Sequence, residues 1–231
     1  LAGGVSLFLP RPKGYRPVPG GILSPDGHCR AFDADARGTL PAEAVGLVVL
    51  MRLEDAVRER HTVRAVILGS SINNDAAHKP AFTAPSIEGP ARVIRQAQAA
   101  AGVLASEIGY VEGHGTGTVL GDAVEVAALT RAFRATTDAV GFCALGSVKT
   151  NIGHTNIAAG VTGLIKTILI LERGVIPASL HFRAPSPEAE LPRSPFFVNA
   201  SAREWPQCTA ALRLAGVSSF GMGGTNAHVI A

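Results

Sequence analysis

Two segments of this chain each carry a histidine in a glycine-rich turn between a predicted strand and a predicted helix. Residues 111–118 read Val-Glu-Gly-His-Gly-Thr-Gly-Thr, and residues 146–154 read Gly-Ser-Val-Lys-Thr-Asn-Ile-Gly-His. The expected strands cover residues 108–112 and 142–148, and the helices that follow cover residues 122–133 and 158–171. Because α/β folds gather their sites where strands end, this arrangement favours an α/β protein with His114 and His154 in one site.

The rest of the chain continues the alternation of strands and helices, which is typical of layered α/β folds. Buried strands are expected at residues 45–51 and 63–72 and helices at residues 53–60 and 86–101, with further strands at residues 196–199, 212–218 and 227–230. Residues 10–41 are rich in proline and glycine and predict an extended surface loop, and residues 73–85 predict a polar loop. The helix over residues 158–171 has Lys166 as its only charge and is expected to be central and buried.

Composition excludes several classes of protein. The chain has 231 residues, of which 47% are hydrophobic and 17% charged, so it is long and apolar enough for one large or two small folded domains. The net charge is +3 with scattered basic residues, which argues against a nucleic-acid partner. No apolar run reaches the ~20 residues that span a bilayer, so no membrane partner is expected.

Further expectations come from the cysteines and the N-terminus. Cys29, Cys143 and Cys208 are widely spaced and suggest neither a disulfide framework nor a zinc site, and a reducing cytoplasmic location fits them. The chain begins without Met or a basic leader, as an excised piece of a longer protein would.

The two histidine turns predict a polar site of defined charge. A helix start after His154 would lower the proton affinity of its imidazole and keep it a neutral hydrogen-bond donor. Lys149 lies in an apolar turn and needs an anion, which Asp122 or Glu125 on the helix after the first turn can supply. Two histidines plus Asp122 could also bind zinc, but no HExxH spacing supports a metal and none is expected.

A third glycine-rich segment, Phe-Gly-Met-Gly-Gly-Thr-Asn-Ala-His at residues 220–228, precedes the last predicted strand. Its backbone N–H groups could serve an oxyanion. Alternatively, such a loop could cradle a phosphate, although it matches no nucleotide motif. His228 alternates with apolar residues and is expected to be structural.

Together these segments resemble the β-ketoacyl synthase family, in particular the ketosynthase domains of modular polyketide synthases and polyketide–peptide hybrids. The resemblance rests on the three glycine-rich motifs, on Leu-Gly-Asp-Ala-Val-Glu at residues 120–125 and on Ser-Pro-Asp-Gly-His-Cys-Arg-Ala-Phe-Asp-Ala at residues 24–34, and also on Asn-Asn-Asp at residues 73–75. It covers essentially the whole chain but only the later part of the family's domain. It implies a thiolase-like layered αβαβα fold, with residues 1–60 ending the N-terminal ketosynthase half and residues 61–231 forming the C-terminal half.

The resemblance also implies a function: decarboxylative Claisen condensation of an acyl thioester with a malonyl-type extender, in polyketide or fatty-acid-like biosynthesis. The catalytic residues would be His114, His154 and Lys149, with Asp122 and Glu125 in the charge network of the lysine. The oxyanion loop would be Gly221, Met222 and Gly223, with Met222 supplying the N–H, and Thr116 and Thr118 would bind the phosphopantetheine arm of an acyl carrier protein. No cofactor is bound in the family, and the partners would be the carrier protein, the N-terminal half and, when intact, a second copy in a homodimer.

The chain departs from the family's pattern in ways that keep a second hypothesis open. The family's nucleophilic cysteine in a Thr-Ala-Cys-Ser-Ser context is absent, and Cys29 lies in a loop where the family has a non-catalytic residue. Ala42 and Ala44 flank Glu43 where the family has glycines, Ala76 follows Asp75 where it has glycine, and Thr-Asn-Ile at residues 155–157 replaces an often acidic segment. The alternative is therefore a non-catalytic ketosynthase-like remnant or partner subunit, and in either case the isolated chain is expected to be inactive as an acyltransferase.

Overall fold

The computed structural model describes residues 1–10, 14–75, 86–205 and 212–231. Its centre is a six-stranded mixed sheet in the order β3-β10-β9-β4-β5-β7. Strands β4 (Ile108–Glu112), β5 (Cys143–Gly146), β7 (Phe196–Val198) and β9 (Leu214–Phe220) run parallel, whereas β10 (Thr225–Ile230) is antiparallel to both β9 and β3 (Gly69–Asn74). The expected strands at residues 108–112, 196–199 and 227–230 are confirmed within a residue or two.

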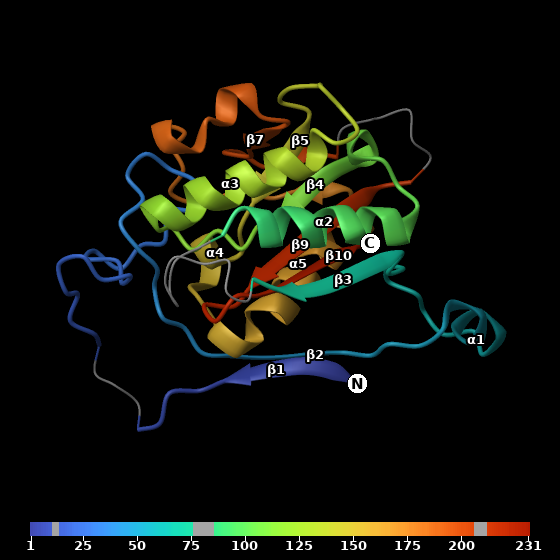
Figure 1. Cartoon of the computed structure of the whole chain (residues 1–231). Helices are drawn as coiled ribbons and strands as arrows, with labels where there is room; N and C mark the ends of the chain where they lie inside the picture. Colours follow the sequence, from blue (N-terminus) through green and yellow to red (C-terminus); the bar gives the residue numbers. More distant parts are fainter. Residues whose placement is uncertain (11–13, 76–85, 206–211) are drawn as a thin grey trace.

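Helices cover both faces of this sheet (Figure 1). Helices α2 (Glu88–Ala101) and α3 (Val119–Phe133) pack together on one face, and α5 (Ala159–Arg173) lies on the other. The apolar stripe expected on α2 is confirmed, because Val93, Ile94 and Ala97 are fully buried. The core between α2, α3 and the sheet is closed by Phe133 and Phe196, whose ring centroids lie 4.7 Å apart.

A small antiparallel sheet, β1 (Ala2–Ser6) with β2 (Ala44–Val48), adds a further layer below α5 (Figure 1). Helix α5 contacts this small sheet and the large sheet, so the layers run helices, sheet, helix, sheet. Two short strands, β6 (Val175–Ile176) and β8 (Arg203–Glu204), form a separate ribbon. Helices α1 (Leu53–Arg58) and α4 (Lys149–Ile152) and single 3₁₀ turns at Ala105–Glu107, Asn156–Ala158, Pro187–Ala189 and Leu191–Arg193 complete the described elements.

The predicted burial of the strand at residues 45–51 is wrong. Val45 and Leu47 are each 61% exposed, and Gly46 is the one buried residue of β2, where it faces Val161 of α5. The predicted strand at residues 63–72 is also wrong in place, because β3 begins at Gly69 and its Ile72 is 71% exposed. The apolar runs that suggested buried strands therefore face an uncovered side of the molecule.

Helix α5 is central, as expected, but it is not buried all round. Its sheet-facing residues Gly163, Thr167 and Ile170 are buried, whereas Leu169 on another side is 41% exposed. The sequence could not distinguish these sides because both are apolar.

The proline-rich segment is a surface loop only in part. Its described residues 14–41 contain no helix or strand, but Cys29, Ala31, Phe32 and Asp33 are buried. The rest of the predicted polar loop at residues 76–85 lies outside the described residues, as do Ala76 and Cys208. Ala42 and Ala44 are not among the described residues with positive φ, so alanine is unstrained there.

Candidate active site

The two histidines of the glycine-rich turns lie side by side at the carboxyl ends of β4 and β5. His114 follows β4, His154 follows the short helix α4, and their ring centroids are 5.4 Å apart in an edge-to-face arrangement. The main chain of Pro41 pairs with that of His154 and holds the second turn against the loop from residues 14–41. The expected meeting of His114 and His154 is thus seen in the structure.

The first turn is shaped by glycines and by two buried carboxylates. Gly115 and Gly117 have φ values of 36° and 75°, a region that favours glycine. Glu125 accepts the backbone N–H groups of His114 at 2.5 Å and Gly115 at 2.7 Å. Asp122 accepts the N–H of Gly117 at 3.1 Å, so helix α3 holds the turn through both side chains.

Lys149 contacts the first turn directly. Its Nζ donates to the carbonyl oxygen of His114 at 2.5 Å, and its side chain is almost fully buried. Burial lowers the pKa of Lys149, while the charges of Glu112, Glu125 and Asp122 act against that shift. Asp122 and Glu125 therefore act on Lys149 through their charge, as expected, but neither is hydrogen-bonded to it. The acceptor at its Nζ is the carbonyl oxygen of His114.

Both imidazoles are held neutral with the same nitrogen free to donate. The N–H of Phe220 points at Nδ1 of His114 (3.4 Å), and the N–H of Asn156 points at Nδ1 of His154 (3.1 Å), so in each ring Nε2 carries the proton. Burial, with the Lys149 charge, lowers the pKa of His154 to about 4 and that of His114 well below its usual value. The cause is burial beside a cation, whereas the sequence had suggested a helix start.

The same burial acts on the two carboxyl groups of α3. It raises the pKa of Asp122 to about 7 and that of Glu125 to about 6, while the backbone N–H groups that they accept and the charge of Lys149 favour the ionised forms. Protonation of either group would remove acceptors from the first turn.

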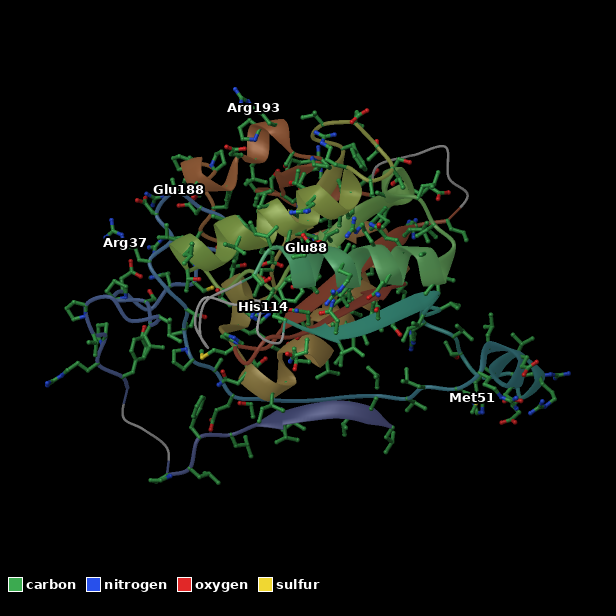
Figure 2. The ribbon with its side chains drawn as sticks, viewed as in Figure 1. Arg37, Met51, Glu88, His114, Glu188 and Arg193 are labelled. Carbon is green, nitrogen blue, oxygen red and sulfur yellow. The ribbon has the colours of Figure 1, made fainter. Side chains whose placement is uncertain are left out.

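A cavity of about 300 Å³ opens beside the two imidazoles. Thr116 and Thr118 line it, with their hydroxyl oxygens 3.0 Å apart. It is also lined by Gly221 and Met222 of the turn between β9 and β10, whereas Gly223 of the same turn is not among the lining residues. All the predicted site residues except Gly223 thus contact the cavity or hold a turn that does, and Figure 2 shows His114 near α4 and the strand ends.

The described cysteines do not resemble nucleophiles. Cys29 is buried, its Sγ contacts the carbonyl oxygen of Thr116 at 3.3 Å, and burial raises its pKa to about 12. Burial also raises the pKa of Cys143 well above its usual value. No cluster of three potential metal ligands occurs in the part of the chain that the structure describes, and no helix there is long and apolar enough to cross a membrane.

Sequence reasoning gave no role to several residues that build the site. The N–H of Phe32 donates to Asp122 at 2.6 Å, and its ring packs beneath the first turn, so part of the proline-rich loop belongs to the site. Asp75 and Asn226 line the cavity and are joined by a 2.8 Å hydrogen bond. Both belong to motifs quoted for the resemblance, which was the available signal. His228 is fully buried and bonds Ser218, in line with its predicted structural role.

Comparison with known proteins identifies the family. Residues 64–183 match the family described as beta-ketoacyl synthase, C-terminal domain, and residues 1–56 match beta-ketoacyl synthase, N-terminal domain. The chain therefore belongs to the β-ketoacyl synthase family.

Its relatives are polyketide synthases. The chain is 49% identical over its full length to a phenolphthiocerol/phthiocerol polyketide synthase subunit of Mycobacterium tuberculosis, of which it covers 15%. It is 43% identical over its full length to polyketide synthase PksL of Bacillus subtilis, of which it covers 5%. It thus spans a small fraction of these relatives.

Solved structures confirm the thiolase-like layered fold. The ketosynthase from module 6 of the bacillaene synthase of Bacillus subtilis is 43% identical and superposes with a TM-score of 0.92, over 99% of this chain and 40% of that one. Ketosynthase twelve of the bacillaene polyketide synthase of Bacillus amyloliquefaciens is 38% identical with a TM-score of 0.95 over the same shares. The chain is therefore the later part of the fold, as the resemblance implied.

Proposed function

We propose that this chain supplies the extender-binding, decarboxylating part of a ketosynthase active site that performs decarboxylative Claisen condensation in polyketide or fatty-acid-like biosynthesis. The observation that carries the proposal is the pair of neutral imidazoles beside one cavity, each with Nδ1 occupied by a backbone N–H. Two neighbouring Nε2–H donors suit one developing enolate oxygen, and pre-aimed donors of this kind are worth several kcal/mol.

The reaction follows from these donors. The carbonyl oxygen of a malonyl-type thioester accepts hydrogen bonds from His114 and His154, and the bond to the carboxylate carbon breaks. Carbon dioxide leaves, and the electron pair of that bond forms the enolate. The α-carbon then attacks the carbonyl carbon of an acyl thioester on a cysteine, forming the new carbon–carbon bond and releasing the thiolate. Lys149 fixes the His114 turn through the carbonyl bond, with Asp122 and Glu125 as its charge partners.

The remaining roles follow the same assignment. Thr116 and Thr118 bind the phosphopantetheine arm that carries the substrate, and no other cofactor takes part. The N–H of Met222, in the loop with Gly221 and Gly223, serves the oxyanion of the condensation step. The partners are an acyl carrier protein, the N-terminal ketosynthase half and a second copy in a homodimer, and the location is cytoplasmic.

We also propose that residues 1–60 end the N-terminal ketosynthase half and residues 61–231 form the C-terminal half. The acyl-accepting cysteine then lies outside this chain, so the isolated chain has no condensing activity. Acyl transfer from a loaded carrier protein onto the isolated chain would contradict this assignment.

The test uses the complete ketosynthase domain that contains this chain, with a malonyl-loaded carrier protein. His154→Ala should lower CO₂ release by about 100- to 1000-fold. It should leave acylation of the cysteine within about twofold, because that step does not use the enolate donors. His181→Ala removes an exposed histidine that lines neither the cavity nor the apolar groove beside α5 and serves as the matched control. Equal loss of both steps in His154→Ala would contradict the assigned role.

A further inference from the structure

One buried carboxylate joins three elements beneath the site. Glu112 is the last residue of β4, and its side chain is 2% exposed. Its Oε1 accepts the backbone N–H of Val148 at 2.5 Å, and its Oε2 accepts the hydroxyl of Tyr110 at 2.5 Å. A carboxylate so far from water needs such donors and a countercharge to remain ionised.

The countercharge comes from the opposite layer. Lys166 of α5 places its Nζ 2.9 Å from Oε2 of Glu112, and the lysine side chain is only 12% exposed. The same Nζ lies 5.7 Å from the centroid of the Tyr110 ring. Helix α5 approaches this closely because Gly163 faces the carboxylate: a Cβ on Gly163 would lie 3.2 Å from Cγ of Glu112.

Glu112 is connected to both histidine turns. Along the chain it stands two residues before His114. Through its bond to Val148 it also fixes the residue before Lys149, whose Nζ holds the carbonyl of His114. By contrast, Asp122 and Glu125 bond backbone N–H groups of the first turn and of Phe32. Among the described carboxylates, Glu112 is thus the one that bonds the start of the second turn.

The charge of Glu112 acts on the same lysine. Of the carboxylates that oppose the burial of Lys149, Glu112 has the largest effect on its pKa. The carboxylate that acts on Lys149 is thus the one that is ion-paired with Lys166 across the layers.

We propose, on the basis of the proposed function, that the ion pair of Glu112 and Lys166 positions the site for decarboxylation. The pair fixes the backbone at Val148 and so keeps Nζ of Lys149 against the carbonyl oxygen of His114. Neither residue touches the substrate. Loss of the pair should displace the two imidazoles relative to each other, and displacements of about 1 Å can cost about 100-fold in rate.

The test compares two steps in the complete ketosynthase domain. Lys166→Met keeps the length of the side chain but removes its charge, and it should lower the kcat of CO₂ release from a malonyl-loaded carrier protein by about 10- to 100-fold. Acylation of the cysteine should change by less than about twofold, and the KM for the malonyl carrier should stay within about threefold. Lys166→Arg should restore most of the rate. The double variant Glu112→Gln, Lys166→Met should lose no more of the decarboxylation rate than the slower of its two single variants, because both substitutions disrupt the same ion pair.

A control variant and a second variant of the pair separate a positioning role from a general loss of stability. Arg131→Met on α3 breaks the exposed pair with Glu88 and should change neither step. Equal loss of both steps in Lys166→Met, or an unchanged decarboxylation rate, would overturn the positioning role. If Lys166→Met does not fold, Tyr110→Phe removes one donor to Glu112 and keeps the ion pair; a severalfold loss of decarboxylation alone supports the role, and no loss or an equal loss overturns it. His154→Ala, run in parallel, reports on the proposed function independently.

Discussion

The histidine cavity and the groove beside α5 differ in how the segments around them are held together. At the cavity, carboxylates, backbone N–H groups and Lys149 are bonded to one another at 2.5–3.1 Å. The groove, of about 890 Å³, is lined mainly by apolar side chains of residues 48–67 and of α5. Figure 2 shows His114 among the strands and helices, whereas Met51 lies at the periphery near α1.

This difference contrasts a hydrogen-bonded site with an apolar surface that faces water. The framework of the cavity is held by hydrogen bonds from backbone N–H groups and Lys149, and it leaves the Nε2–H groups of the two imidazoles free to donate. The groove exposes Val49 at 76%, Leu50 at 55% and Met51 at 48%, so three consecutive large apolar side chains face water there. The chain spans 40% of the solved ketosynthase from module 6 of the bacillaene synthase.

The largest expected effect tests whether the cavity side contains a reactive thiol. In a Cys208→Ser background, Cys29 and Cys143 should react with a disulfide reagent at pH 7–8 about 1000-fold more slowly than a free thiol, because burial raises the pKa of Cys29 to about 12 and raises that of Cys143 as well. Absorbance of the released thiolate measures the rate, and the unfolded chain in denaturant is the control. Rapid labelling of Cys29 in the folded chain would contradict this prediction, because it would show that a reactive thiol lies beside the cavity.

The next effect concerns the groove. The isolated chain should self-associate, and Val49→Lys with Met51→Lys should weaken that association by at least about tenfold, which is ~1.4 kcal/mol. Analytical ultracentrifugation over a concentration series measures it. Leu104→Lys changes a similarly exposed leucine, 54% exposed, that does not line the groove, and should leave association unchanged. A monodisperse monomer that melts cooperatively would contradict this prediction, because the apolar groove would then stay exposed without driving association.

The smallest effect is a change in proton affinity inside the cavity. Nuclear magnetic resonance of ring-labelled histidines should give His154 a pKa of about 4, and Lys149→Met should raise it toward its usual value because the repelling charge is gone. Since the pKa of the folded state lies below that of the unfolded state, the contribution of His154 to stability is present above about pH 6.5 and is lost as the pH falls through about 4. Arg131→Met, on the exposed side of α3, is the control. An unchanged pKa of His154 in Lys149→Met would show that burial alone lowers it and that the charge of Lys149 does not act on this imidazole.

Much of the site could be predicted from the sequence because its parts are short and local. Strand β4, its glycine turn and helix α3 follow one another directly in the chain, so a single strand–turn–helix unit places His114, Asp122 and Glu125. Positive φ at Gly115 and Gly117 explains why those positions are glycine. The roles of Phe32 and Glu112 could not be predicted in the same way. Phe32 meets Asp122 from 90 residues away, and Glu112 meets Lys166 through the packing of α5 on the sheet.

The sequence by itself determined the α/β alternation, the two histidine turns and the resemblance to β-ketoacyl synthases, because these depend on local residue order and short periodic patterns. Only the tertiary structure decided which apolar runs are buried, which atom Lys149 bonds, and which imidazole nitrogen is left to donate. The apolar runs at residues 45–51 and 63–72 have the composition of core strands and nonetheless lie at an open groove. The physical reason is that burial is a property of what packs against a segment, and that partner is not encoded in the segment.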